Sequence, residues 1–87
     1  MATEARAKLK VFKMGGGESV IDIQHRFANA STECVIEGVP ETDEALARTL
    51  MTYPSERWRS YVDTIALRQP APTVVEIFAR MIMLEER

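Results

Sequence analysis

The strongest structural signal in the chain is the segment 19–37, which reads SVIDIQHRFANASTECVIE. Its apolar residues recur at steps of three and four, at Val20, Ile23, Phe27, Ala30 and Cys34. This spacing predicts an amphipathic α-helix with one buried face. Ser19 can cap the start of the helix, and Gly38 followed by Pro40 ends it.

Turn-forming residues divide the rest of the chain into shorter helical segments. The first covers about residues 3–13 and ends before the three glycines at 15–17, which we expect to form a turn or hinge. A short helix begins at Thr42 or Asp43 and ends before Pro54.

Two more helices are predicted in the C-terminal part of the chain. Ser55 begins one of them, with Trp58 on its buried side, and Thr73 and Glu76 have the spacing of a capping box at the start of the last. Strand-type alternation is nearly absent. The sequence therefore predicts an all-α fold, a compact bundle of about five short helices.

Composition and charge limit the possible functions. Hydrophobic residues make up 46% and charged residues 28% of the 87 residues, which is typical of one globular domain. The net charge is −2 and the basic residues are dispersed, so we expect weak or no direct nucleic-acid binding. No apolar stretch is long enough for a membrane span, and the charged N-terminus lacks a signal-peptide core. With a single cysteine, these features predict a cytoplasmic protein without membrane association.

No combination of residues predicts catalysis, so we expect that the chain is not an enzyme. His25 and Cys34 lie nine residues apart on one helix, about 13 Å, which is too far for a nucleophile and its base. We expect His25 at the surface and Cys34 in the core. The glycines at 15–17 lack the strand and the Lys-Ser or Lys-Thr of a phosphate loop. No catalytic, cofactor-binding or metal-binding residue is therefore predicted.

A series of short motifs carries a family resemblance. In order these are Phe12-Lys13-Met14, Gly17-Glu18-Ser19-Val20, Arg26-Phe27, Gly38-Val39-Pro40, Asp43-Glu44, the stretch from Tyr53-Pro54 to Trp58, and Leu84-Glu85-Glu86-Arg87. Together they resemble the Gag polyprotein of copia-type LTR retrotransposons over nearly the whole chain. The resemblance implies an N-terminal helix with a glycine hinge, 1–17, followed by a domain like the C-terminal domain of retroviral capsids, 18–87.

The same region resembles the major homology region of retroviral capsids. There a glutamate precedes an Arg-Phe pair by eight residues, as Glu18 precedes Arg26 and Phe27 here. The resemblance implies a buried hydrogen-bond network between Glu18 and Arg26, with Phe27 in the core. Met14 stands where the signature has a glutamine, so the network would be smaller. Without the family, the same two residues indicate an exposed ion pair.

The resemblance implies a structural function, in which the domain pairs with copies of itself in a Gag particle. A homodimer or higher homo-oligomer with other Gag copies is therefore expected, from a retrotransposon or a domesticated derivative. In related capsids the second helix of this domain forms a dimer contact, and here the last helix has an apolar face wider than one small core needs. We predict self-association through Leu46, Leu50, Met51, Phe78, Met81 and Ile82.

A different class of function is also compatible with the sequence. A helical adaptor domain would hold another protein in an apolar groove between its helices. A concentration-dependent dimer favours self-assembly, whereas a monomer with an open apolar groove favours the adaptor.

Overall fold

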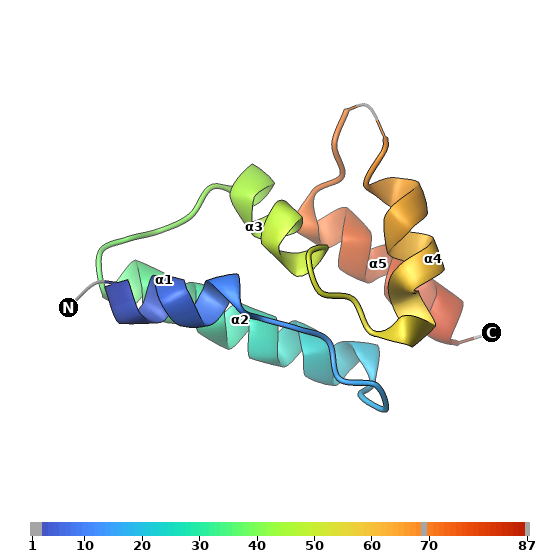
Figure 1. Cartoon of the computed structure of the whole chain (residues 1–87), viewed down its shortest axis with the longest axis horizontal. Coiled ribbons are helices and arrows are strands. Elements are labelled where there is room, and N and C mark those ends of the chain that lie inside the picture. The colour runs from blue at the N-terminus through green and yellow to red at the C-terminus, as the bar shows by residue number, and fades with distance from the viewer. Residues whose placement is uncertain (1–2, 69, 87) are drawn as a thin grey trace.

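The computed structural model describes residues 3–68 and 70–86, and these residues form five α-helices. In chain order they are α1 (Thr3–Lys10), α2 (Val20–Ile36), α3 (Asp43–Leu50), α4 (Glu56–Ile65) and α5 (Val74–Glu85) (Figure 1). The described residues contain no strand. The predicted all-α class with about five short helices is therefore confirmed.

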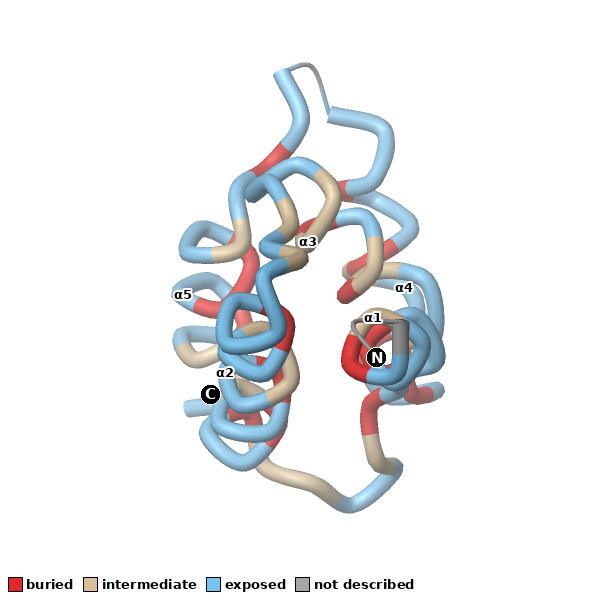
Figure 2. Tube along the Cα trace, turned by 90° about the vertical axis from the view of Figure 1, so that its left-hand side faces the viewer, coloured by how far each residue is buried: buried red, intermediate tan, exposed pale blue. Residues whose placement is uncertain are grey.

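The helices are arranged in two layers. In Figure 2, α2 and α5 lie on one side and α1 and α4 on the other, with α3 at one end between them. Contacts between helices link α1 to α2, α2 to α5, and α5 to α3. The molecule measures 42 × 29 × 18 Å, and its shortest dimension fits two helices packed at the usual distance of about 8–10 Å.

Side-chain caps explain where the helices begin. The hydroxyls of Ser19 and Thr42 each accept a hydrogen bond of 3.2 Å from the backbone N–H three residues later. Thr73 and Glu76 form the predicted capping box at the start of α5. Ser55 is the residue before α4, as predicted, but its side chain makes no cap hydrogen bond.

The end of α2 is fixed by Gly38. Its φ of 78° lies in the left-handed region, which a residue without a Cβ adopts at little cost. The N–H of Gly38 donates to the carbonyl of Val35 at 3.0 Å, and the N–H of Val39 donates to that of Cys34 at 2.8 Å. This is the Schellman pattern, which pairs carbonyls that the helix itself leaves unpaired.

The first helix is shorter than predicted. We expected it to reach residue 13, but it ends at Lys10. The N–H of Met14 instead donates to the carbonyl of Tyr53 at 3.1 Å, so the chain crosses to the loop between α3 and α4. This path places Phe12 and Met14 in the core, with 7% and 5% of their surface exposed. A long-range backbone contact therefore overrides the local helical pattern.

One core fills the space between the layers, and it takes residues from both sides of the glycine turn at 15–17. Its buried members are Ala5, Leu9, Phe12, Met14, Val20, Ile23, Phe27, Cys34, Ala47, Leu50, Trp58, Val62, Ile65, Ile77, Phe78 and Met81. The predicted burial of Phe27, Cys34 and Trp58 is confirmed. None of the described helices is both long and apolar enough to span a membrane.

Candidate functional site

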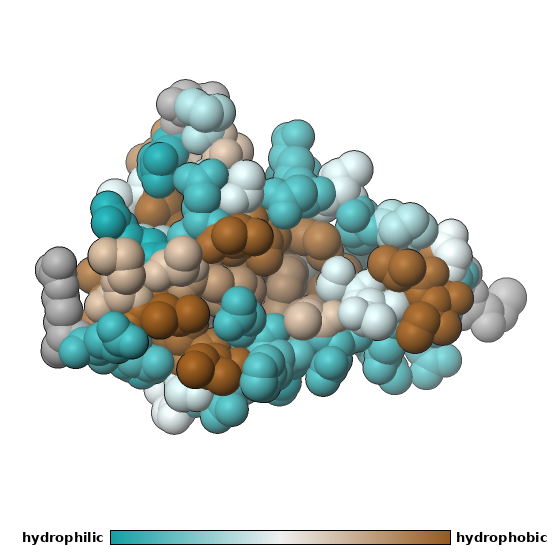
Figure 3. Space-filling model, turned by 180° about the vertical axis from the view of Figure 1, so that it is seen from behind, coloured by the Kyte–Doolittle hydropathy of each residue, from teal (hydrophilic) through white to brown (hydrophobic). Residues whose placement is uncertain are grey.

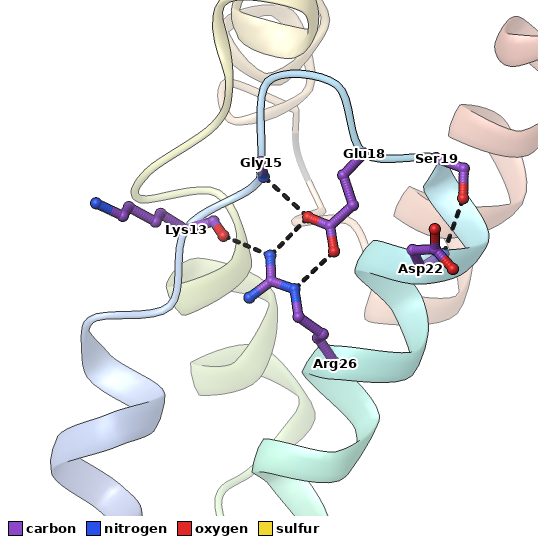
Figure 4. A network of polar contacts seen from close by, with 6 residues as sticks. All are labelled: Lys13, Gly15, Glu18, Ser19, Asp22 and Arg26. Carbon is purple, nitrogen blue, oxygen red and sulfur yellow. Dashed lines mark hydrogen bonds and ion pairs between the residues drawn. The ribbon is translucent and has the colours of Figure 1, made fainter.

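Glu18 and Arg26 form a bidentate pair between the glycine turn and α2 (Figure 4). Arg26 donates from Nε to Oε2 of Glu18 at 2.6 Å and from Nη2 to Oε1 at 2.7 Å. Parallel contacts of this kind fix orientation as well as distance, because the planar guanidinium matches the carboxylate. The eight-residue spacing of the sequence motif is therefore a direct contact across the turn.

The pair also holds the backbone before α2. Nη2 of Arg26 donates to the carbonyl of Lys13 at 2.8 Å, and Oε1 of Glu18 accepts a hydrogen bond of 2.9 Å from the N–H of Gly15. The Ser19 cap follows immediately (Figure 4). Two side chains thus fix both ends of the glycine turn and attach it to the first turns of α2.

A side chain at position 15 would crowd the Glu18 carboxylate. A Cβ added there would lie 2.9 Å from Oε1 and 3.2 Å from Cβ of Glu18, closer than side-chain carbons normally approach. At Gly16 and Gly17 a Cβ would meet no atom within 4 Å. One glycine of the three therefore belongs to the network.

Aromatic rings connect the network to the core. The Arg26 guanidinium lies 4.6 Å from the centre of the Phe12 ring, within cation–π distance. Phe12 meets Phe27 edge-on, with ring centres 5.1 Å apart, and Phe27 contacts Phe78 of α5 at 6.1 Å. Arg26 therefore covers the edge of an aromatic cluster that spans the two layers.

The burial of the pair differs from the prediction. The Glu18 side chain is 17% exposed and that of Arg26 is 48% exposed, so the carboxylate is partly buried, the guanidinium lies at the surface, and the expectation of a buried network is wrong. The Arg26 hydrogen bond holds the pKa of Glu18 below its ordinary value, partial burial opposes this effect, and the Gly15 N–H lowers the pKa further. Arg26 remains about half exposed because its guanidinium lies over the Phe12 ring at the edge of the core and not within it.

Three of the six residues predicted for self-association belong to the core. Leu50, Phe78 and Met81 are 0%, 3% and 0% exposed, so the prediction of an interface role is wrong for them. Leu46, Met51 and Ile82 are partly buried against the core. An apolar helix face has the same sequence pattern whether it meets its own core or another molecule, which is why the pattern did not separate the two groups.

Large apolar residues are exposed at positions that the sequence analysis did not select. On α2 and α5 these are Ile21, Val35, Ile36, Val75, Met83 and Leu84. A helical-wheel comparison of the core side of α2 with its other sides would have identified the first two.

Glu85 joins three helices and was also missed. Its Oε2 accepts hydrogen bonds from the N–H of Val20 at 3.1 Å and from Arg57 of α4 at 3.2 Å. It therefore caps α2 with a charge that suits a helix N-terminus. The dipole of α5 disfavours a carboxylate in the last turn of that helix. This local conflict was the feature of the sequence that could have indicated a tertiary role for Glu85.

His25 and Cys34, the two residues weighed above as a catalytic base and nucleophile, take no part in this network. His25 is exposed, and Cys34 is fully buried, with a pKa raised mainly by that burial. Within residues 3–68 and 70–86, no three His, Cys, Asp or Glu side chains lie close enough together to hold a metal ion. The geometry of the Glu18–Arg26 network is that of a structural clamp, with both groups satisfied by each other and by backbone.

Comparison with known proteins identifies no relative, because no protein-family model, curated protein or solved structure matches the chain.

Proposed function

We propose that this chain is a capsid-type self-assembly domain of a Gag polyprotein of the copia class, or of a host protein derived from one. The observation that carries the proposal is the bidentate Glu18–Arg26 contact across the glycine turn. Its residues have the order and spacing of the capsid signature, and Phe27 follows them into the core. The all-helical fold is compatible with this assignment.

A rigid turn suits an assembly domain for a physical reason. Repeated contacts between copies add up to a closed particle only if each copy holds its surfaces at a constant angle. The clamp fixes the turn at both ends, and Glu85 fixes the N-terminus of α2 from the other side. We infer that α2 and its neighbours serve as a rigid frame on which contact surfaces are presented.

The proposal includes partners and location. Other copies of the same polyprotein are the partners, and the element acts in the cytoplasm. Direct nucleic-acid binding by this domain would be weak and without sequence preference, because the net charge is −2 and five arginines pair with carboxylates, namely Arg6, Arg26, Arg48, Arg57 and Arg68.

Light scattering over a concentration series tests the proposal. We expect the weight-average mass of the purified chain to rise above the monomer value of 9.8 kDa as the concentration increases from about 10 μM to about 1 mM, the range of weak protein contacts. A mass that stays at the monomer value over this range would contradict self-assembly by this domain.

A groove between α4 and α5 favours the adaptor as the second candidate. It has a volume of about 570 Å³ and is lined by apolar groups of Tyr61, Ile65, Pro72, Met83 and Leu84. A chain that remains monomeric and takes up an amphipathic helical peptide there would support this function in place of assembly.

A further inference from the structure

The long helix α2 has a second face that carries no charge, and its central residue, Ala28, is exposed. Beside the core stripe, helical geometry groups six neutral residues, Ile21, Gln24, Ala28, Ser31, Thr32 and Val35. Asp22, Arg26 and Glu33 lie on the opposite side of the helix. Of the acidic and basic residues of α2, His25 alone borders the neutral group. We name these six residues the neutral face.

Four of the six residues of the neutral face are exposed, whereas Gln24 and Ser31 are partly buried. Ile21 is 52% and Val35 58% exposed, and Ala28 between them is also exposed. A shallow groove of about 320 Å³ runs beside it toward α5, where Val75 is 76% exposed. Figure 3 shows this side of the molecule, on which brown and pale side chains continue along the middle between hydrophilic edges. Leaving large apolar groups exposed together is characteristic of an interaction surface.

The order of residues on the neutral face is symmetric about Ala28. Ile21 lies seven residues before it and Val35 seven residues after it, both large and apolar, whereas Gln24 and Thr32 lie four residues to either side. Two antiparallel copies of α2 that meet at Ala28 would therefore place Ile21 opposite Val35 and Gln24 opposite Thr32, while Ser31 would lie opposite His25. A twofold contact between identical chains requires this self-complementary order.

We propose that a second copy of this chain docks on the neutral face, with the two α2 helices antiparallel and crossing at Ala28. Ile21 of each copy packs against Val35 of the other, and Gln24 meets Thr32. This inference rests on the proposed self-assembly and names the surface through which it occurs. The small side chain at position 28 permits the close approach of two helices at their crossing point.

Charge permits this occupant, and the area determines how strong the contact is. The neutral face itself has no ionisable side chain, whereas His25 at its edge would lie opposite Ser31, and Asp43 of α3 lines the adjoining groove. The 17 residues of α2 extend about 25 Å. A strip about 10 Å wide along the helix therefore offers a contact area of about 250 Å² per copy, well below the roughly 800 Å² per partner of a stable complex. The contact is therefore weak in isolation, which suits a chain present in many adjacent copies better than a single dissimilar partner.

Disulfide trapping tests the crossing point. In a Cys34→Ala background, which removes the only native thiol, Ala28→Cys should form a covalent dimer on mild oxidation, because a disulfide needs Cα atoms within about 7 Å. Glu33→Cys, exposed on the charged side of the same helix, is the matched control and should remain largely monomeric. Equal dimer yield from both variants would contradict the proposed face.

Mixed trapping tests the register. Ile21→Cys and Val35→Cys should each give little dimer alone, since antiparallel copies separate the like positions by about 21 Å, but a mixture of the two should give the heterodimer. Dimer from Ile21→Cys alone at a yield above that of the mixture would overturn the antiparallel arrangement.

A variant without cysteines keeps this test distinct from that of the proposed function. Ala28→Lys places a charge at the crossing point, so the dissociation constant for self-association should rise at least about tenfold. Because position 28 is exposed, the circular dichroism spectrum of the variant should match that of the parent. If the parent associates and Ala28→Lys associates equally well, the neutral face is wrong and self-assembly stands. If the parent stays monomeric to about 1 mM, both proposals fail.

Discussion

At Glu18 and Arg26 the two side chains differ in exposure, and this difference determines how much their contact contributes to stability. A fully exposed ion pair contributes about 0–1 kcal/mol, whereas breaking a buried one costs about 3–5 kcal/mol. With 17% of Glu18 and 48% of Arg26 exposed, the pair lies between these limits. Its two hydrogen bonds are short, and both partners also bind backbone, which raises the expected value above that of a surface pair.

We predict that Arg26→Ala lowers the free energy of unfolding by about 1–3 kcal/mol, the range for hydrogen bonds to charged groups. Arg48→Ala is the matched control, because Arg48 pairs with Glu44 at 3.1 Å while both side chains are more than 70% exposed. The control should change by less than about 0.5 kcal/mol. Urea unfolding measures both, and equal losses would reduce the Glu18–Arg26 pair to an ordinary surface contact.

The pKa of Glu18 predicts a pH dependence. The folded-state pKa of Glu18 is depressed below the ordinary 4.5. The contribution of the ionised carboxylate to the free energy of unfolding is therefore complete above about pH 4.5 and is lost as the pH falls through the folded-state pKa. The unfolding free energy of the parent should therefore fall more steeply toward acid than that of Glu18→Gln. The free energy of unfolding of both proteins is measured between about pH 3 and 7. Parallel pH curves for the parent and Glu18→Gln would show that the Glu18 carboxylate does not titrate in a network.

Gly15 gives a test of the turn that leaves both charged residues in place. In Gly15→Ala the new methyl displaces the Glu18 carboxylate, so we expect a loss of about 1 kcal/mol, seen as a melting temperature about 4–8 °C lower. Gly16→Ala meets no atom and should be neutral or slightly stabilising, because alanine restricts the unfolded chain. Equal melting temperatures for Gly15→Ala and Gly16→Ala would contradict this prediction.

At the scale of helices, the sequence was informative where the controlling residues are local. The Thr73–Glu76 capping box and the Gly38 stop lie within a few residues of the boundaries they set, and both were predicted correctly. The end of α1 depends instead on a contact between Met14 and Tyr53, far apart in the chain, which no local pattern contains. The Glu18–Arg26 contact was accessible through the family motif, but its degree of burial depended on tertiary packing.

The buried aromatic rings, Phe27 in the cluster between the layers and Trp58 beside Tyr61, should dominate the stability of the helices that they join. We predict that Phe27→Ala and Trp58→Ala each cost about 3–5 kcal/mol, since both rings are at most 5% exposed. A domain of this size has a total stability near the lower end of about 5–15 kcal/mol, so each variant should be largely unfolded. Tyr53→Ala, which removes a half-exposed ring, is the control and should retain a cooperative melt. Melts of all three that overlay the parent would contradict the core assignment.

At the scale of the whole molecule, burial separates what holds the fold from what is available to a partner. Leu50, Phe78 and Met81 are part of the core, so the contact surface has to be sought among exposed residues, and one group without charge lies along α2. Sequence periodicity identified the core face of that helix, because its steps of three and four are strong. The neutral face beside it is a weaker pattern, visible only once the core side is known.

Nuclear magnetic resonance of the labelled chain at increasing concentration tests self-assembly through α2 most directly. Between about 20 μM and 1 mM, a range that covers weak association, we expect amide signals of Ile21, Gln24, Ala28, Thr32 and Val35 to shift progressively. Signals on the charged side of the same helix, such as that of Glu33, should move less. Spectra that superimpose at all concentrations, or shifts confined to helices other than α2, would contradict the account.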